Sequence, residues 1–254
     1  MKREEEMIQP PLFSKAEETK VILQVKGVSK QFGQLVAIKD LSFEVNSGEI
    51  FGVAGPNGAG KSTLFNLISG VYQGSGDIIF DNLNIHGLRP YQICHKGIAR
   101  TFQIPVVFPT LTVYRNVEAG AFFGRQGVRI GREEVDEVID FIGLRGKEST
   151  VAGVVDLYTR KLTMLATAFA TKPRILLLDE PMAGLSPAES KHFLELVRRI
   201  NKESGITIMI IEHLVKVLTE VCERLLVLHY GEKLCIGPPK EVMEDSAVAE
   251  VYLR

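Results

Sequence analysis

The sequence predicts an α/β fold that combines a phosphate-binding loop, an antiparallel opening section and an inserted helical section. Residues 55–63, GPNGAGKST, have the form G-x-x-x-x-G-K-[ST] and follow an apolar run of strand length. A second apolar run, residues 175–178, ends in two carboxylates. Between the two, from about residue 88 to residue 171, the pattern is mainly helical. Apolar strands that alternate with helices predict a parallel sheet with helices on its faces.

Strands are predicted from short apolar or alternating runs that are bounded by turn residues. In chain order they are expected at residues 22–25, 35–38, 41–45, 50–53, 77–80, 175–178 and 206–211. Those before residue 46 form the antiparallel section, and the turn Asn46-Ser47-Gly48 leads into the strand before the loop. The wholly apolar run at 175–178 indicates a strand that is buried on both faces.

Helices are expected at residues 62–68, from Pro187 and from Leu214. Ser186, Pro187 and Glu189 have the pattern of a capping box at the start of the second of these helices. In the helical section, apolar residues recur at i, i+3, i+4 and i+7 and indicate one buried face: Val135, Val138, Ile139 and Ile142. Residues 1–20 are charged and contain prolines, so we expect a flexible tail, and residues 21–254 are expected to form one large domain.

The glycine-rich loop has the residue types that binding a phosphate requires. Glycines let the backbone adopt conformations that a Cβ forbids, so that consecutive N–H groups turn inward around phosphate oxygens. Lys61 adds a positive charge, Ser62 offers a hydroxyl to Mg²⁺, and the following helix directs its N-terminus at the phosphates. A plain glycine-rich surface turn is the alternative, and the strand-loop-helix context disfavours it. The predicted nucleotide ligands are Asn57, Gly58, Ala59, Gly60, Lys61, Ser62 and Thr63.

The acidic pair Asp179-Glu180 is the second chemical feature. It follows a buried strand, and ligands of parallel sheets bind at the carboxyl ends of the strands. Asp179 is predicted to hold Mg²⁺ through water. Glu180 is predicted to orient, or take a proton from, the water that attacks the γ-phosphate of ATP. Acidic pairs at strand ends are often merely solvated, so this prediction depends on the phosphate-binding loop beside it.

Composition excludes several classes of function. The net charge is −1 and no basic stripe is present, so nucleic acid is not expected as a partner. Three cysteines, Cys94, Cys222 and Cys235, are too widely spaced for a zinc motif and fit a reducing compartment. No apolar run reaches the length that spans a bilayer. If the protein works at a membrane, we therefore expect another chain to supply the membrane part.

With these features in order, the chain from residue 21 onward resembles an ATP-binding-cassette ATPase. Three further residues match the family's motifs: Phe32 in KQFGQLVAI, Gln103 in RTFQIP and His213 in IMIIEH. The resemblance implies that Phe32 stacks on adenine, that Gln103 joins the Mg²⁺ and water site to a helical subdomain, and that His213 contacts the γ-phosphate. It also implies a P-loop NTPase (RecA-like) core, an antiparallel β subdomain and a helical subdomain at about 88–171, with ATP and Mg²⁺ as cofactors.

Several phrases resemble the cassettes of branched-chain amino acid importers, among them GIARTFQIPVVFPTLTVYRNV and DEPMAGLSPAE. This likeness implies membrane permease subunits, a periplasmic or extracellular solute-binding protein, and a peripheral position on the cytoplasmic face of the membrane. Cassettes that serve urea or short-amide import, or lipopolysaccharide export, share many of the same sequence motifs. Two further alternatives are a soluble cassette ATPase and a regulatory cassette without turnover. The apolar run at 105–109 is either part of a permease-docking surface or core.

One motif departs from the family. Where the family has a signature loop of the type L-S-G-G-Q, this chain has Val155, Asp156, Leu157, Tyr158 and Thr159. In the family this loop reaches, in trans, the γ-phosphate held by the other subunit of a head-to-tail dimer. Asp156 would bring a carboxylate there, and like charges about 4 Å apart repel by roughly 4 kcal/mol at an effective dielectric near 20. Tyr158 would add bulk. We therefore predict a heterodimer with a second, similar ATPase, unless the alignment shifts or the subfamily tolerates a loose signature.

Overall fold

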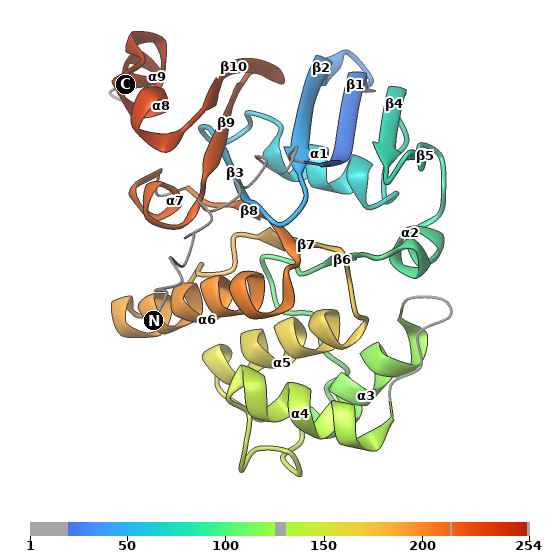
Figure 1. The fold of residues 1–254 in the computed structure, drawn as a ribbon. Coiled ribbons are helices and arrows are strands. Elements are labelled where there is room, and N and C mark those ends of the chain that lie inside the picture. The colour runs from blue at the N-terminus through green and yellow to red at the C-terminus, as the bar shows by residue number, and fades with distance from the viewer. Residues whose placement is uncertain (1–19, 125–130, 214, 253–254) are drawn as a thin grey trace, which may run out of the picture.

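The computed structural model describes residues 20–124, 131–213 and 215–252, and Figure 1 shows their arrangement. The expected tail, residues 1–20, lies outside the described residues except for Lys20. Within these ranges the strands form two sheets. One has the strand order β2-β1-β4-β5, and the other has the order β10-β9-β3-β8-β7-β6. The fold is therefore α/β with an antiparallel sheet beside a mainly parallel one, as the sequence predicts.

The first sheet is antiparallel throughout. Its strands are β1 (Val21–Phe32), β2 (Leu35–Asn46), β4 (Ser75–Phe80) and β5 (Leu83–Asn84). The prediction of two separate strands at 35–38 and 41–45 is wrong, because β2 runs through both. Asp40 lies between them with φ of 44°, and the pairing register with β1 shifts on either side of it. An irregularity of this kind bends a strand without ending it.

The second sheet carries the strand that leads into the glycine-rich loop. Its strands are β3 (Ile50–Ala54), β6 (Ile98–Arg100), β7 (Ile175–Asp179), β8 (Thr207–Ile211), β9 (Arg224–His229) and β10 (Glu232–Gly237). β10 pairs antiparallel to β9, and the remaining pairings are parallel. The expectation of a mainly helical section at 88–171 missed β6, because three residues are too few to show a period. The β9–β10 hairpin was not predicted either.

Helices cover both sheets. They are α1 (Lys61–Ile68), α2 (Pro90–Lys96), α3 (Val113–Phe123), α4 (Arg132–Ile142), α5 (Leu157–Ala170), α6 (Pro187–Ser204), α7 (Val215–Val221), α8 (Pro239–Glu244) and α9 (Ser246–Tyr252). The predicted apolar stripe is confirmed, since its four residues are the buried ones of α4. The capping box of α6 is confirmed as well, with Ser186 and Glu189 bonded reciprocally. The expected start of α7 at Leu214 lies outside the described residues.

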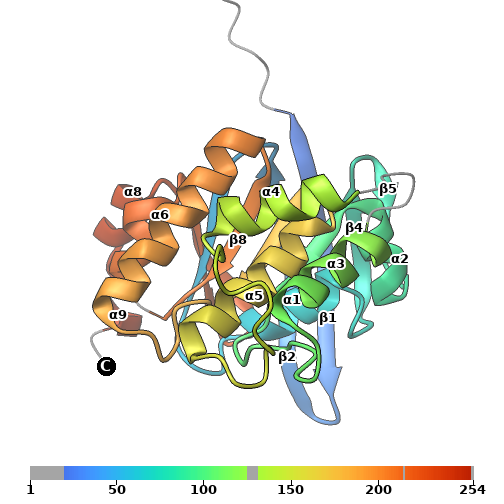
Figure 2. The same cartoon turned by 90° about the horizontal axis from the view of Figure 1, so that it is seen from below.

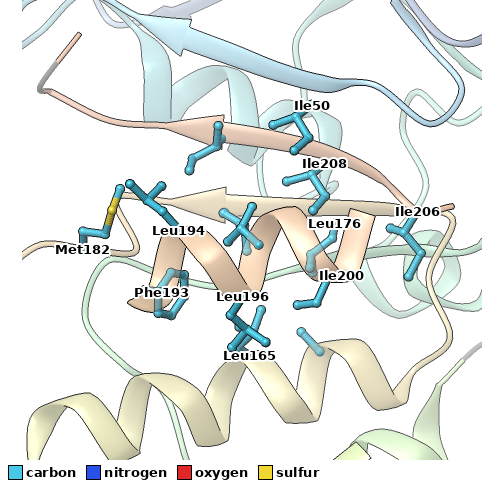
Figure 3. Packing of buried hydrophobic residues seen from close by; sticks show 14 of the residues in the cluster. Ile50, Leu165, Leu176, Met182, Phe193, Leu194, Leu196, Ile200, Ile206 and Ile208 are labelled. Carbon is cyan, nitrogen blue, oxygen red and sulfur yellow. The ribbon is translucent and has the colours of Figure 1, made fainter. Parts of the chain in front are cut away.

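The main core lies between the second sheet and the helices below it. Figure 3 shows Ile50, Leu176 and Ile208 pointing from three neighbouring strands toward Ile200 and the rest of α6. On the far side of α6, Leu165 of α5 continues the same apolar cluster. Helices α3, α4 and α5 pack on one another beneath it, and Figure 2 shows this helical layer from below. Because β3, β8 and β7 pair in parallel, their carboxyl ends lie together at one edge of this packed sheet.

Candidate functional site

The glycine-rich loop follows β3 directly and is shaped by close backbone approaches. Gly55 has φ of 146°, and a Cβ there would lie 2.3 Å from the carbonyl oxygen of Leu228. Gly60 has φ of 103°, and a Cβ there would lie 2.5 Å from the carbonyl oxygen of Ala37. No larger residue fits at either position. The loop is therefore clamped between β2 and the end of β9, with α1 beginning at its last glycine.

Lys61 turns its side chain inward, across its own loop. Its Nζ donates to the carbonyl oxygens of Gly55 at 2.7 Å and Pro56 at 2.9 Å. The residue is 5% exposed, and burial lowers the pKa of the ammonium group, although Glu180 and Asp179 nearby oppose that shift. A cation held in this way lies at the centre of the loop, where consecutive N–H groups would surround an anion.

Two oxygen groups face each other beside the loop. Ser62 lies in the first turn of α1, and its Oγ is 3.5 Å from Oδ1 of Asp179 at the end of β7. A hydroxyl and a carboxylate are the hard oxygen donors that Mg²⁺ prefers, and Mg²⁺ sites in such enzymes use few protein ligands because substrate phosphates supply others. The donor set at this edge therefore fits Mg²⁺. Gln103, the third expected metal ligand, donates a hydrogen bond from its Nε2 to Glu180.

The Glu180 carboxylate is held between side chains from two other loops. Its Oε2 accepts a hydrogen bond from Nε2 of Gln103 at 2.5 Å, and its Oε1 lies 2.6 Å from Nε2 of His213. The Glu180 side chain is 8% exposed, whereas that of His213 is 43% exposed. Glu180 has φ of 46°, and its N–H donates to the carbonyl of Ile211 at 3.0 Å. The structure thus brings together the three residues for which the sequence predicted catalytic roles, and an unusual backbone conformation aims the carboxylate.

Phe32 lines one pocket together with the glycine-rich loop, Glu180 and His213. The pocket has a volume of about 290 Å³ and is lined by residues 57–63 of the loop, Glu180, His213, Phe32 and neighbouring residues of β2. Phe32 is 40% exposed and packs edge to face on Tyr72, with ring centroids 5.1 Å apart. Nζ of Lys30 lies 4.8 Å from the centroid of the Phe32 ring. Phe32 is therefore braced by its neighbours while part of the ring stays open to a ligand.

Two buried charged residues that sequence reasoning did not select lie directly behind Glu180. Lys161 of α5 is 1% exposed, and its Nζ donates to the carbonyl oxygens of Gln103 at 3.2 Å and Glu180 at 3.5 Å. Glu212 is 6% exposed and accepts a hydrogen bond from the N–H of Met182 at 3.1 Å. Burial raises the pKa of Glu212 to about 7. The sequence could have indicated Glu212, because it directly precedes His213. Nothing in the sequence indicates that Lys161 lies beside Glu180, since only the fold brings the two together.

A third such residue, Arg100 at the end of β6, pairs with Asp179. Its Nη2 donates to Oδ2 of Asp179 at 2.7 Å, and both side chains are 7% exposed. Arg100 precedes Gln103 by three residues in RTFQIP, so it lies within a motif that the sequence did single out. The edge strand β6 was not predicted, and without it nothing in the sequence indicates that the two residues meet.

Residues Val155–Thr159, which stand where the family has its signature loop, lie at the start of α5. Asp156 is the N-cap: its carboxylate accepts hydrogen bonds from the N–H of Thr159 at 2.7 Å and from the Thr159 hydroxyl at 2.9 Å. These bonds hold the pKa of Asp156 below its usual value. Among the described residues that line the pocket between Phe32 and Glu180, none comes from this stretch. Leu157 is 40% exposed, while Tyr158 packs partly against the core.

The fold and the glycine-rich loop define a P-loop NTPase of the cassette type. The family model described as ABC transporter matches residues 38–183. BraF of Pseudomonas aeruginosa, a high-affinity branched-chain amino acid transport ATP-binding protein, is 31% identical, with 91% of this chain and 97% of BraF covered. LptB of Haemophilus influenzae, the lipopolysaccharide export system ATP-binding protein, is 32% identical over the same shares. The ADP conformation of MJ1267, an ATP-binding cassette of an ABC transporter, superposes with a TM-score of 0.82 at 30% identity, covering 92% of this chain and 99% of MJ1267.

The chain therefore belongs to the ABC transporter family. It is an ATP-binding ATPase whose hydrolysis is coupled to transport. In the part of the chain that the structure describes, no helix is long and apolar enough to cross a membrane.

Proposed function

We propose that this chain is the ATP-hydrolysing subunit of an importer for branched-chain amino acids. The observation that supports turnover best is the Glu180 carboxylate, which Gln103 and His213 hold beside the phosphate-binding loop. The likeness to BraF, together with the quoted phrases of the sequence, supports the choice of cargo. The cassette itself does not contact cargo, so the cargo follows from the permease with which it assembles.

In the proposed reaction, a water oxygen bonds to the γ-phosphorus of ATP, the bond from that phosphorus to the bridging oxygen of ADP breaks, and Glu180 receives the proton of the water. His213 and Gln103 position the carboxylate, and Lys61 exchanges its carbonyl partners for phosphate oxygens. Phe32 stacks on the adenine. Ser62 and Asp179, with Gln103, would hold Mg²⁺, which neutralises phosphate charge when it is bound.

We propose that the residues directly after Gln103 form the surface that contacts the permease. Ile104 is 78% exposed, Val106 is 64% exposed and Phe108 is 56% exposed. This exposure favours docking over a core role for the apolar run at 105–109, since exposed apolar groups in a row mark interaction sites. A permease seated here would place the chain on the cytoplasmic face of the membrane, with a solute-binding protein on the other side.

We further propose that the working unit is a heterodimer with a second ABC ATPase. The cap that Asp156 forms on α5 occupies the N–H group of Thr159, which would otherwise be available to an anion, and it adds a negative charge there. A partner with an intact signature would complete the site built on Lys61, Glu180 and His213 of this chain. Replacing Asp156 by Ser and Tyr158 by Gly should raise the ATPase rate of the assembled complex. An unchanged rate and nucleotide affinity would contradict this.

The first test is affinity purification of tagged Glu180→Gln from detergent-solubilised native membranes with ATP and Mg²⁺. Wild type and Glu195→Gln serve as controls, because Glu195 lies on the outer surface of α6. We expect a multi-span permease and a second cassette chain to copurify with Glu180→Gln, and complex activity to be lost in that variant alone. Recovery of a permease for lipopolysaccharide or urea would contradict the proposed cargo. Recovery of this chain alone, with unchanged activity, would favour a regulatory cassette.

A further inference from the structure

Arg100 connects the elements that carry the expected Mg²⁺ ligands. One terminal nitrogen, Nη2, donates to Oδ2 of Asp179 at 2.7 Å. The other, Nη1, donates to Oδ1 of Asn66 at 2.7 Å and to Oγ of Ser69 at 3.0 Å. Asn66 belongs to α1, the helix that begins with Lys61 and Ser62, and Ser69 caps its end. One guanidinium group therefore joins α1, β6 and β7.

The position of this guanidinium group is fixed from its sides as well. Its central carbon lies 5.0 Å from the ring centroid of Phe102 and 5.8 Å from that of Phe65. A planar fork of several donors that can also stack on aromatic rings is a property of arginine that lysine does not share. The side chain is 7% exposed, so water does not compete effectively for these bonds.

The ion pair decides which oxygen of Asp179 is free. Oδ2 is taken by Arg100, whereas Oδ1 faces Ser62 at 3.5 Å. The carboxylate is thus prevented from rotating, and the oxygen that remains is the one beside the hydroxyl of the other expected ligand. The charge of Arg100 also offsets one of the two adjacent carboxylates, Asp179 and Glu180, whose mutual repulsion would otherwise disfavour the buried pair.

We propose that Arg100 is a positioning residue for the metal site: it orients Asp179 against Ser62 and thereby sets how strongly Mg²⁺ increases the affinity for ATP. This inference rests on the proposed nucleotide and Mg²⁺ site, and it adds a residue that acts on that site through Asp179. Groups that hold a metal ligand in place typically alter metal affinity by about 10- to 100-fold when they are removed.

The chain offers a matched control for Arg100. Arg174 also ion-pairs with an aspartate, Asp81, and its guanidinium carbon lies 5.5 Å from the ring centroid of Phe80. Arg174 precedes the amino end of β7, whereas Asp179 lies at the carboxyl end of that strand, and the side-chain hydrogen bonds of Arg174 go to Asp81. Loss of Arg174 therefore removes a similar set of contacts at a distance from the expected metal ligands.

The experiment measures the dissociation constant of ATP by calorimetry, once with Mg²⁺ and once with EDTA, for wild type, Arg100→Gln, Arg100→Lys and Arg174→Gln. The effect of Mg²⁺ is the dissociation constant in EDTA divided by the dissociation constant in Mg²⁺. We expect this ratio to fall at least about tenfold in Arg100→Gln, while the affinity without metal changes little. Arg174→Gln should keep the wild-type ratio. Arg100→Lys, which retains the charge and the fold but not the fork, should show an intermediate ratio.

The proposed role of Arg100 would be overturned if both Arg100 variants kept the wild-type ratio. If Arg100→Gln does not fold, a wild-type ratio in Arg100→Lys alone would overturn it. A fall of the same size in Arg174→Gln would overturn it too, because the effect would then be a general loss of stability. Failure of the underlying proposal would give a different result, because wild type itself would then bind ATP equally well with Mg²⁺ and with EDTA.

Discussion

Replacing Glu212 by Gln should change how the stability of the protein depends on pH. Glu212 is 6% exposed, and burial raises its pKa from an ordinary value of 4.5 to about 7. The charged groups that face it are Glu180, which opposes its ionisation, and Lys161 of α5, which favours it. The N–H groups of Met182 and His213 also favour the ionised form, but they do not offset the burial.

The sign and size of the effect follow from these two pKa values. Between pH 4.5 and 7 the folded chain keeps a proton on Glu212 that the unfolded chain has released, so stability falls as pH rises through this window. The full contribution is present below pH 4.5 and is lost above 7. A pKa difference of this size corresponds to on the order of 3 kcal/mol in the free energy of unfolding. Gln has the shape of the protonated acid and does not titrate.

Urea unfolding of wild type and Glu212→Gln between pH 4.5 and 8.5 tests this prediction. We expect similar stability at the acid end and an advantage for Glu212→Gln that grows to on the order of 3 kcal/mol above pH 7. Glu195→Gln, which removes a carboxylate from the surface, should follow wild type across the range. A difference between wild type and Glu212→Gln that stays constant with pH would refute the reasoning.

Three further substitutions test the core and the pocket. Ile139→Ala should cost about 2 to 5 kcal/mol of unfolding free energy in urea titrations, because Ile139 is fully buried, and a loss below about 1 kcal/mol would contradict this. Phe32→Ala should weaken ATP binding by roughly 5- to 150-fold through lost stacking but leave inorganic tripolyphosphate binding unchanged; an equal loss for both ligands would argue against base stacking. Gly60→Ala should abolish ATP binding, since its Cβ would lie 2.5 Å from the Ala37 carbonyl oxygen. Gly143→Ala, which has a similar positive φ but open space around it, should still bind ATP.

The elements that could be predicted from the sequence are those whose signal is local. Residues 175–178 are all apolar, and the glycine pattern of the loop reflects backbone constraints that the structure shows at Gly55 and Gly60. The stripe of α4 repeats often enough to define a period. The strands predicted at residues 35–38 and 41–45 are one strand, because the irregularity at Asp40 bends β2 without ending it.

The features that could not be predicted depend on contacts between distant segments. Arg100 and Asp179 meet only because β6 pairs with β7, and Lys161 reaches Glu180 only because α5 packs under the same edge of the sheet. Asp156 shows a different limit. Its cap on α5 explains why an aspartate is stable there, but the motif alone indicated only what this residue would disturb.

The place of β3 in its sheet determines when the protein can acquire its nucleotide site. β3 lies between β8 and β9, and both neighbours are more than 150 residues further along the chain. During synthesis the glycine-rich loop therefore emerges from the ribosome long before the strands that anchor it, and pairing over such separations is slow. A fragment limited to residues 38–183 would contain the loop but neither neighbour of β3. ATP can stabilise the nascent chain only after β9 has been made, so premature termination anywhere before it yields a product that nucleotide cannot rescue.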